Sequence, residues 1–143
     1  MTFWSGAFGL ALLAAFLWGT GATIEKVAMR GGDPMGGVFI RAVVAMVASG
    51  VFFSVTPQGW KPLTGSTPLS MVLFALTGFT SMVLGQAFFF KALKLDDASR
   101  IVPISGTYPL IAAILSIAFL GEPLTVKKAV AVLLIVTGIA LLK

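Results

Sequence analysis

Residues 91–143 read KALKLDDASRIVPISGTYPLIAAILSIAFLGEPLTVKKAVAVLLIVTGIALLK, and this stretch decides the fold of the chain. It holds two apolar runs, each close to the length of a membrane span, on either side of a short Gly-Glu-Pro turn. A helix of a soluble protein hides one apolar stripe, whereas these runs are apolar on all sides. The stretch therefore predicts helices that cross a lipid bilayer.

Composition supports the same class. Of 143 residues, 58% are hydrophobic and 10% are charged, and the mean hydropathy is +1.04. A soluble domain carries charge on about a quarter of its residues, so this chain has too few polar residues to cover a buried core of this size. We expect an integral membrane protein.

Several kinds of chemistry are excluded by residue type. The chain has no cysteine and no histidine, which removes disulfides, thiolate nucleophiles, imidazole bases and the usual zinc ligands. No cluster of carboxylates stands in for them, so we expect no enzyme activity, no cofactor and no metal site. The net charge of +5 comes from basic residues scattered at segment ends. That pattern is typical of orientation signals rather than of nucleic-acid binding.

Five apolar stretches approach the length of about 20 helical residues that a bilayer core requires. The fold expected is all-α and integral to the membrane, with five transmembrane helices in a single domain over residues 1–143. The last of these helices reaches a spanning length when Lys127 and Lys128 extend to the lipid headgroups. The predicted spans are residues 3–24, 38–55, 69–90, 101–120 and 124–142.

The connections between these stretches contain turn residues. Residues 30–34 predict a turn with a helix stop and restart, and residues 56–68 predict a loop in which Trp60 suits the membrane interface. In residues 94–99, Asp96, Asp97 or Ser99 is expected to cap the next helix.

Basic residues are unequally divided between the two sides of the predicted topology. The rule that positive loops stay inside then places the amino terminus outside and the carboxyl terminus in the cytoplasm, in the cell membrane. One side carries Lys26, Arg30, Arg41, Lys91, Lys94, Arg100 and Lys143, and the other carries Lys61, Lys127 and Lys128.

The chain resembles the EamA family of the drug/metabolite transporter superfamily. The similar segments are the Trp-Gly motif followed by a basic residue in 17–26, the loop proline and second-helix arginine in 34–41, the third-helix ending in 85–93, and Pro103, Tyr108-Pro109, Gly121-Glu-Pro-Leu-Thr125 and Gly138. The resemblance covers essentially the whole chain and one family repeat.

Typical members of this family have ten spans, built from two five-helix halves of opposite orientation. The chain is similar to the short five-span bacterial and archaeal members of the superfamily. The resemblance therefore implies that a complete transport path needs a second copy, as a homodimer, or a partner half-transporter. An outside amino terminus would suit the family's second half.

The fourth predicted span contains the best candidate for a broken helix. Pro103 and Pro109 lack N–H donors and leave helix carbonyls unpaired, while Ser105, Thr107 and Tyr108 supply hydroxyls. A wall of a polar cavity is one interpretation. The alternative is a proline kink that serves packing alone.

Charged residues near the ends of spans are candidates for a gate or for coupling. Arg41 is expected either to bind a substrate anion, to form an internal ion pair, or to extend to the headgroups. Glu25 and Lys26 form either a gate or an interfacial charge pair. Lys91 is a further candidate for a gate or for coupling. Glu122 either caps the fifth helix or takes part in proton coupling.

Three uncharged side chains complete the candidates for the pathway. Gln86 is expected to make a hydrogen bond between helices, with cavity lining as the less favoured interpretation. Trp18 and Tyr108 are placed to stack against a ligand. No carboxylate lies in the middle of any span, so proton-coupled export of cationic drugs is not expected.

The function expected is a transporter of a small polar or amphipathic metabolite that works by alternating access, with the lipid bilayer, a second half and a small molecule as its partners. One alternative is a lipid-linked sugar flippase subunit, in which Arg41 and Lys91 would line a groove for phosphate. A second alternative is a membrane assembly protein that transports nothing.

Overall fold

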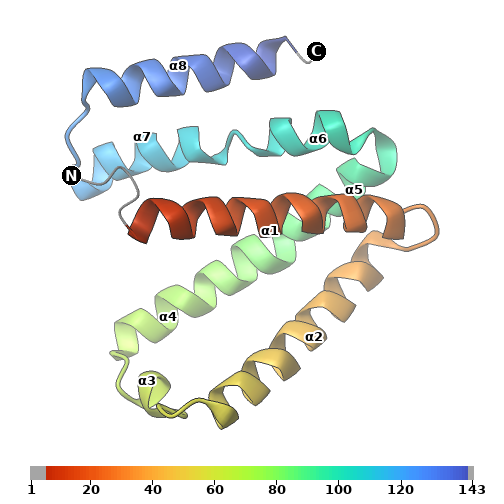
Figure 1. Cartoon of the computed structure of the whole chain (residues 1–143), viewed down its shortest axis with the longest axis vertical. Coiled ribbons are helices and arrows are strands. Elements are labelled where there is room, and N and C mark those ends of the chain that lie inside the picture. The colour runs from red at the N-terminus through yellow and green to blue at the C-terminus, as the bar shows by residue number, and fades with distance from the viewer. Residues whose placement is uncertain (1–5, 142–143) are drawn as a thin grey trace. The chain divides into compact units, whose positions relative to one another are not determined.

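The computed structural model describes residues 6–141, and every regular element among them is helical (Figure 1). This confirms the all-α expectation. The elements are α1 (Gly6–Ala28), α2 (Pro34–Val55), α3 (Lys61–Thr64), α4 (Pro68–Thr77), the π-helix η1 (Gly78–Gly85), α5 (Gln86–Leu95), α6 (Ala98–Ser105), α7 (Tyr108–Leu120) and α8 (Val126–Ala140).

Four helical stretches in the described residues are long and apolar enough to cross a membrane. They are α1, α2, the run α4–η1–α5 (Pro68–Leu95) and the pair α6–α7 (Ala98–Leu120). The helix α8 has 15 residues, which is about 22 Å of helix and short of a bilayer core. A fifth span over 124–142 therefore stays a prediction. Its last residue, like the first residues of the span predicted at 3–24, lies outside the described residues.

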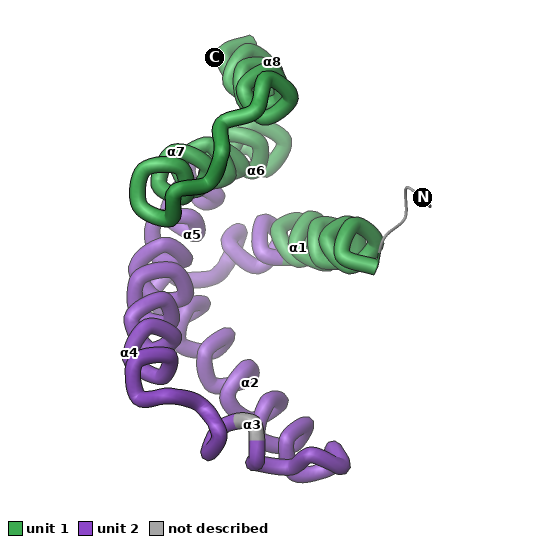
Figure 2. Tube along the Cα trace, turned by 90° about the vertical axis from the view of Figure 1, so that its left-hand side faces the viewer, with its two compact units in different colours: residues 1–24, 96–143 green, residues 25–95 purple. Residues whose placement is uncertain are grey.

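The chain divides into two compact units, one of residues 1–24 with 96–143 and one of residues 25–95 (Figure 2). That the whole chain forms one domain stays a prediction.

The packed core of the unit 25–95 lies where α2 meets α5. Leu93 is fully buried, and Met29, Val38 and Phe90 are each at most 5% exposed. Gly37 permits this contact, because a Cβ atom there would lie 3.0 Å from the ring of Phe90. The two helices therefore approach at a residue that has no side chain.

The turn between α1 and α2 forms as the sequence predicts. One carboxylate oxygen of Asp33 accepts hydrogen bonds from the backbone N–H groups of Met35 and Gly36, both at 2.9 Å, and caps α2. Pro34 occupies the first turn of α2, where its missing N–H costs nothing. The helix thus starts at residue 34, four residues before the predicted span.

Two lysines fasten this turn to the end of α5. The Lys26 ammonium donates to the Leu93 carbonyl oxygen at 2.7 Å, and the Lys94 ammonium donates to the Gly32 carbonyl oxygen at 2.9 Å. The turn between α1 and α2 and the end of α5 therefore lie at the same end of the unit. At the other end, Trp60 stacks on Phe53 with ring centroids 5.5 Å apart.

In the unit that holds α6, α7 and α8, the fourth stretch is broken between Ser105 and Tyr108. Pro103 lies inside α6, as expected for a proline that removes an interior helix bond. The same expectation for Pro109 is wrong, because α6 has already ended and Pro109 sits in the first turn of α7. The Thr107 hydroxyl donates to the Ile104 carbonyl oxygen at 2.8 Å and so belongs to the break.

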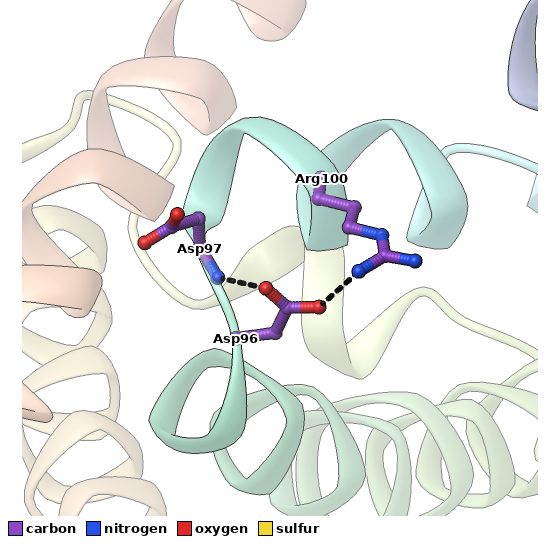
Figure 3. Close-up of polar contacts among 3 residues, drawn as sticks. All are labelled: Asp96, Asp97 and Arg100. Atoms are coloured by element: carbon purple, nitrogen blue, oxygen red, sulfur yellow. Dashed lines mark hydrogen bonds and ion pairs between the residues drawn. The ribbon is translucent and has the colours of Figure 1, made fainter. Parts of the chain in front are cut away.

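The start of α6 differs from the capping we expected. Asp97 occupies the N-cap position, but no hydrogen bond from its side chain caps the helix in the described structure. Asp96 instead accepts from the backbone N–H of Asp97 at 2.7 Å and from Arg100 at 3.1 Å (Figure 3). Ser99 lies within the helix and is not its cap.

The Gly-Glu-Pro turn also corrects one expectation. Gly121 has a φ of 66° and ends α7 in the left-handed conformation that glycine adopts without strain. The cap of α8 is Thr125, whose hydroxyl oxygen accepts from the Lys128 N–H at 3.3 Å. Glu122 does not cap the helix; its carboxylate lies 3.0 Å from the Lys128 ammonium.

The close approach at Gly37 yields a stability prediction. Gly37→Leu forces a side chain into the Phe90 ring, and overpacking of this kind costs about 1–3 kcal/mol. Gly50→Leu is the matched control, because a Cβ atom there meets nothing within 4 Å and the gain in helix propensity is the same. We expect the melting temperature of the purified protein in detergent to fall for Gly37→Leu and not for Gly50→Leu. Equal melting temperatures for the two variants would contradict the close α2–α5 contact.

Candidate functional site

A groove of about 550 Å³ lies between α2 and the run formed by η1 and the start of α5, within the unit 25–95. It is lined by Val38, Arg41, Ala42, Ala45, Met46, Ser49, Gly78, Ser81, Met82, Val83 and Gln86. The volume is in the range of pockets that hold small molecules.

The groove exists because α2 and the third stretch are in contact at one end only. The main packed contact of α2 is with α5, α2 also touches η1, and α4 diverges from α2 toward the other end of the unit (Figure 1). Ala45 and Ser49 line the groove from α2, and Gly78 and Ser81 line it from η1. Small side chains here leave the space open, although the spacing of Ala45 and Ser49 is also typical of closely packed membrane helices.

The eight-residue π-helix η1 shapes one wall. Its wider turn shows in the Gln86 N–H, which bonds to the carbonyl oxygen of Ser81, five residues before it. π-Helical segments are rare, and short π-bulges within α-helices are frequently found at functional sites. Three consecutive residues of η1, Ser81 to Val83, line the groove. Sequence reasoning missed this element, for which the glycines at positions 78 and 85 are the only visible signal.

An ion pair lies at the packed end of the groove. The Arg41 guanidinium contacts the Glu25 carboxylate, and the Glu25 side chain is 17% exposed while that of Arg41 is 45% exposed. Of the three expectations for Arg41, the structure has the internal ion pair. Pairing lowers the cost of holding a guanidinium and a carboxylate away from water.

The other predicted gate residues are placed differently. Glu25 pairs with Arg41, and the ammonium of its neighbour Lys26 bonds to the Leu93 carbonyl oxygen. Lys91 is exposed on α5 and is not among the residues that line the groove. The pairing of Arg41 with Lys91 in one groove, which a flippase would use for phosphate, is therefore not found.

Gln86 lines the same groove as Arg41. Its side-chain nitrogen is buried and has no hydrogen-bond partner among the described residues. The helix–helix hydrogen bond that we expected is thus missing for this nitrogen, and cavity lining is the better description. An unpaired buried donor costs about 1–3 kcal/mol of folding stability, and the Gln86 amide is such a donor.

The remaining candidates belong to the other unit. Trp18 on α1 is 64% exposed and Tyr108 on α7 is 57% exposed. Pro103, Ser105, Thr107 and Pro109 form or flank the break between α6 and α7. Their contribution to a substrate path, and stacking by the two aromatic rings, stay predictions.

Comparison with known proteins decides the family. The model of the EamA-like transporter family matches residues 5–143. The chain belongs to this family. No solved structure matches it significantly.

Relatives of this EamA chain include proteins of its own length. An uncharacterized transporter encoded in the cobO 3′ region of a Sinorhizobium species is 31% identical over 134 residues, which is 92% of each chain. An uncharacterized protein of Methanocaldococcus jannaschii is 28% identical over 93% of each chain. The uncharacterized transporter YvbV of Bacillus subtilis is 28% identical over 92% of this chain but 43% of its own length. The EamA repeat thus occurs both as a chain of this size and as part of a longer one.

The ion pair at the end of the groove is testable by a double-mutant cycle of Glu25→Gln and Arg41→Gln. We expect a coupling free energy of about 1–3 kcal/mol, because Glu25 is largely shielded from water and Arg41 is its charged partner. The measurement is the unfolding free energy of the four proteins in detergent micelles.

The control cycle uses Glu122→Gln and Lys128→Gln, since both side chains of that pair are about half exposed. Its coupling should stay below about 1 kcal/mol. A coupling at Glu25–Arg41 no larger than the control would contradict a structural role for the ion pair.

Proposed function

We propose that this EamA chain is one half of a membrane transporter for a small polar or amphipathic metabolite, with the groove of the unit 25–95 as part of the substrate path. The observation that carries the proposal is the groove itself. The groove lies between two helical stretches of membrane length, and its lining combines the polar residues Arg41 and Gln86 with an apolar wall.

The form of the third stretch supports this reading. Binding sites in transporters are commonly built where a membrane helix departs from regular geometry. Here the π-helix η1 supplies one wall of the groove, and Gln86 follows it directly. The break between α6 and α7 is a second discontinuity of this kind.

The working unit in the proposal is a dimer of two five-helix halves that alternate in access, either two copies of this chain or the chain with a partner half. In the proposed topology α8, extended to residues 124–142, is the fifth span, the amino terminus lies outside and the carboxyl terminus lies in the cytoplasm of a cell membrane. Lys26 bonds to Leu93 and Lys94 bonds to Gly32 at one end of the unit. These bonds support placing the turn after α1 and the connection after α5 on the same side of the membrane.

Blocking the groove tests the proposal. Proteoliposomes loaded with a ¹³C-labelled extract of polar metabolites should release a subset of these metabolites faster than liposomes without protein. The release is followed by mass spectrometry. Ser49→Trp and Ser81→Trp place an indole in the groove and should abolish this release. Val44→Trp should leave it intact, because Val44 lies on α2, is 61% exposed and does not line the groove.

Release that survives both groove variants would rule out the groove as the path. No protein-dependent release of any metabolite would favour the alternative of a membrane assembly protein.

A further inference from the structure

We infer that the groove selects molecules of zero net charge that combine an apolar body with a carboxamide-like group, one that both donates and accepts hydrogen bonds. This inference names the substrate class of the proposed transport site, and it rests on the proposed function only in taking the groove as the place where the substrate binds.

The first argument is the charge of the groove. Arg41 is the one charged residue among the lining residues of the described groove, and Glu25 pairs with it. A bound anion would meet a guanidinium already matched by a carboxylate, and a bound cation would meet no carboxylate in the lining. Moving an ion out of water without a partner is far costlier than moving a neutral polar group, so both kinds of ion are disfavoured.

The second argument is the polar group that the groove does offer. The Gln86 amide has a nitrogen without a partner among the described residues, and its side chain lines the groove. That nitrogen is buried in the described structure, so it reaches a ligand only when the last torsion of the side chain, which is broad and roughly two-fold, turns it toward the groove. An amide offers both functions without charge, and the complementary ligand group is another amide.

Hydroxyl groups add neutral partners along the same groove. The Ser49 hydroxyl donates to the Met46 carbonyl oxygen at 3.0 Å, which leaves its oxygen able to accept. Ser81 faces the same space from η1. The lining residues between these polar groups are Val38, Ala42, Ala45, Met46, Met82 and Val83, an apolar wall in which the methionines adapt to the shape of the ligand.

The test uses three probes of matched shape: phenylacetamide, phenylacetate and 2-phenylethylammonium. Their binding to the purified chain in lipid nanodiscs is measured by isothermal titration calorimetry near pH 7. We expect phenylacetamide to bind at least about fivefold more tightly than either ion, the size of effect that one buried hydrogen bond gives.

Two charge-changing variants of similar size should move this preference in opposite directions. Gln86→Glu adds a carboxylate to the groove and should make 2-phenylethylammonium the best of the three. Glu25→Gln removes the partner charge of Arg41 and should make phenylacetate the best. Gln86→Leu should weaken phenylacetamide binding about five- to tenfold without lowering the melting temperature, because it deletes an unpaired donor. The matched control is Gln58→Leu in the loop after α2, which should change nothing.

The inference is overturned if either ion binds the unaltered protein as tightly as phenylacetamide, if none of the probes binds the folded protein, or if both charge variants keep the original order. It is equally overturned if Gln86→Leu lowers the dimer fraction on size-exclusion chromatography and leaves binding unchanged, since the amide would then serve a contact between two copies. If the unaltered protein binds the probes as expected but causes no release of metabolites from proteoliposomes, the proposed transport is refuted and the selectivity of the groove is not.

Discussion

The ion pair between Arg41 and Glu25 is the interaction on which the rest of the unit 25–95 depends. An arginine one turn or two inside a membrane helix needs a partner or a route to water, and Glu25 at the end of α1 supplies the partner. The pair holds the end of α1 against α2. The bonds from Lys26 and Lys94 to carbonyl oxygens then fix the same end of the unit to α5.

Close packing of α2 on α5 at that end of the unit leaves the groove between α2 and η1. The α2–α5 contact at Gly37 and Phe90 brings the two helices together, and small residues beyond it leave the facing walls apart. The ion pair also neutralises the only charge in the described lining. The α2–α5 contact thereby sets the position of the groove, and the ion pair leaves its described lining without net charge.

Sequence reasoning predicted the helical class, the turn at Asp33-Pro34 and five spans, four of which correspond to helical stretches of membrane length, because hydropathy and turn residues are local signals. It named Arg41 and Gln86 as candidates but assigned Gln86 to a helix–helix hydrogen bond, since the local pattern does not show which neighbours an amide meets. The partner of Arg41 was open for the same reason, as Glu25 lies across a turn. The π-helix was missed because an apolar run of this length reads as a regular helix. Pro109 and Glu122 were misassigned because helix ends shift by a few residues with tertiary context.

The most direct test of the account is the accessibility of the groove from the two sides of the membrane. The chain has no cysteine, so Ser49→Cys and Ser81→Cys each introduce a single thiol into the groove, and Val44→Cys places one on the exposed side of α2. Labelling by a membrane-impermeant maleimide is measured in right-side-out and in inverted vesicles. The account predicts that both groove cysteines react in both kinds of vesicle and that the Val44→Cys protein reacts in neither. Groove cysteines that react no faster than the one at position 44 would contradict it.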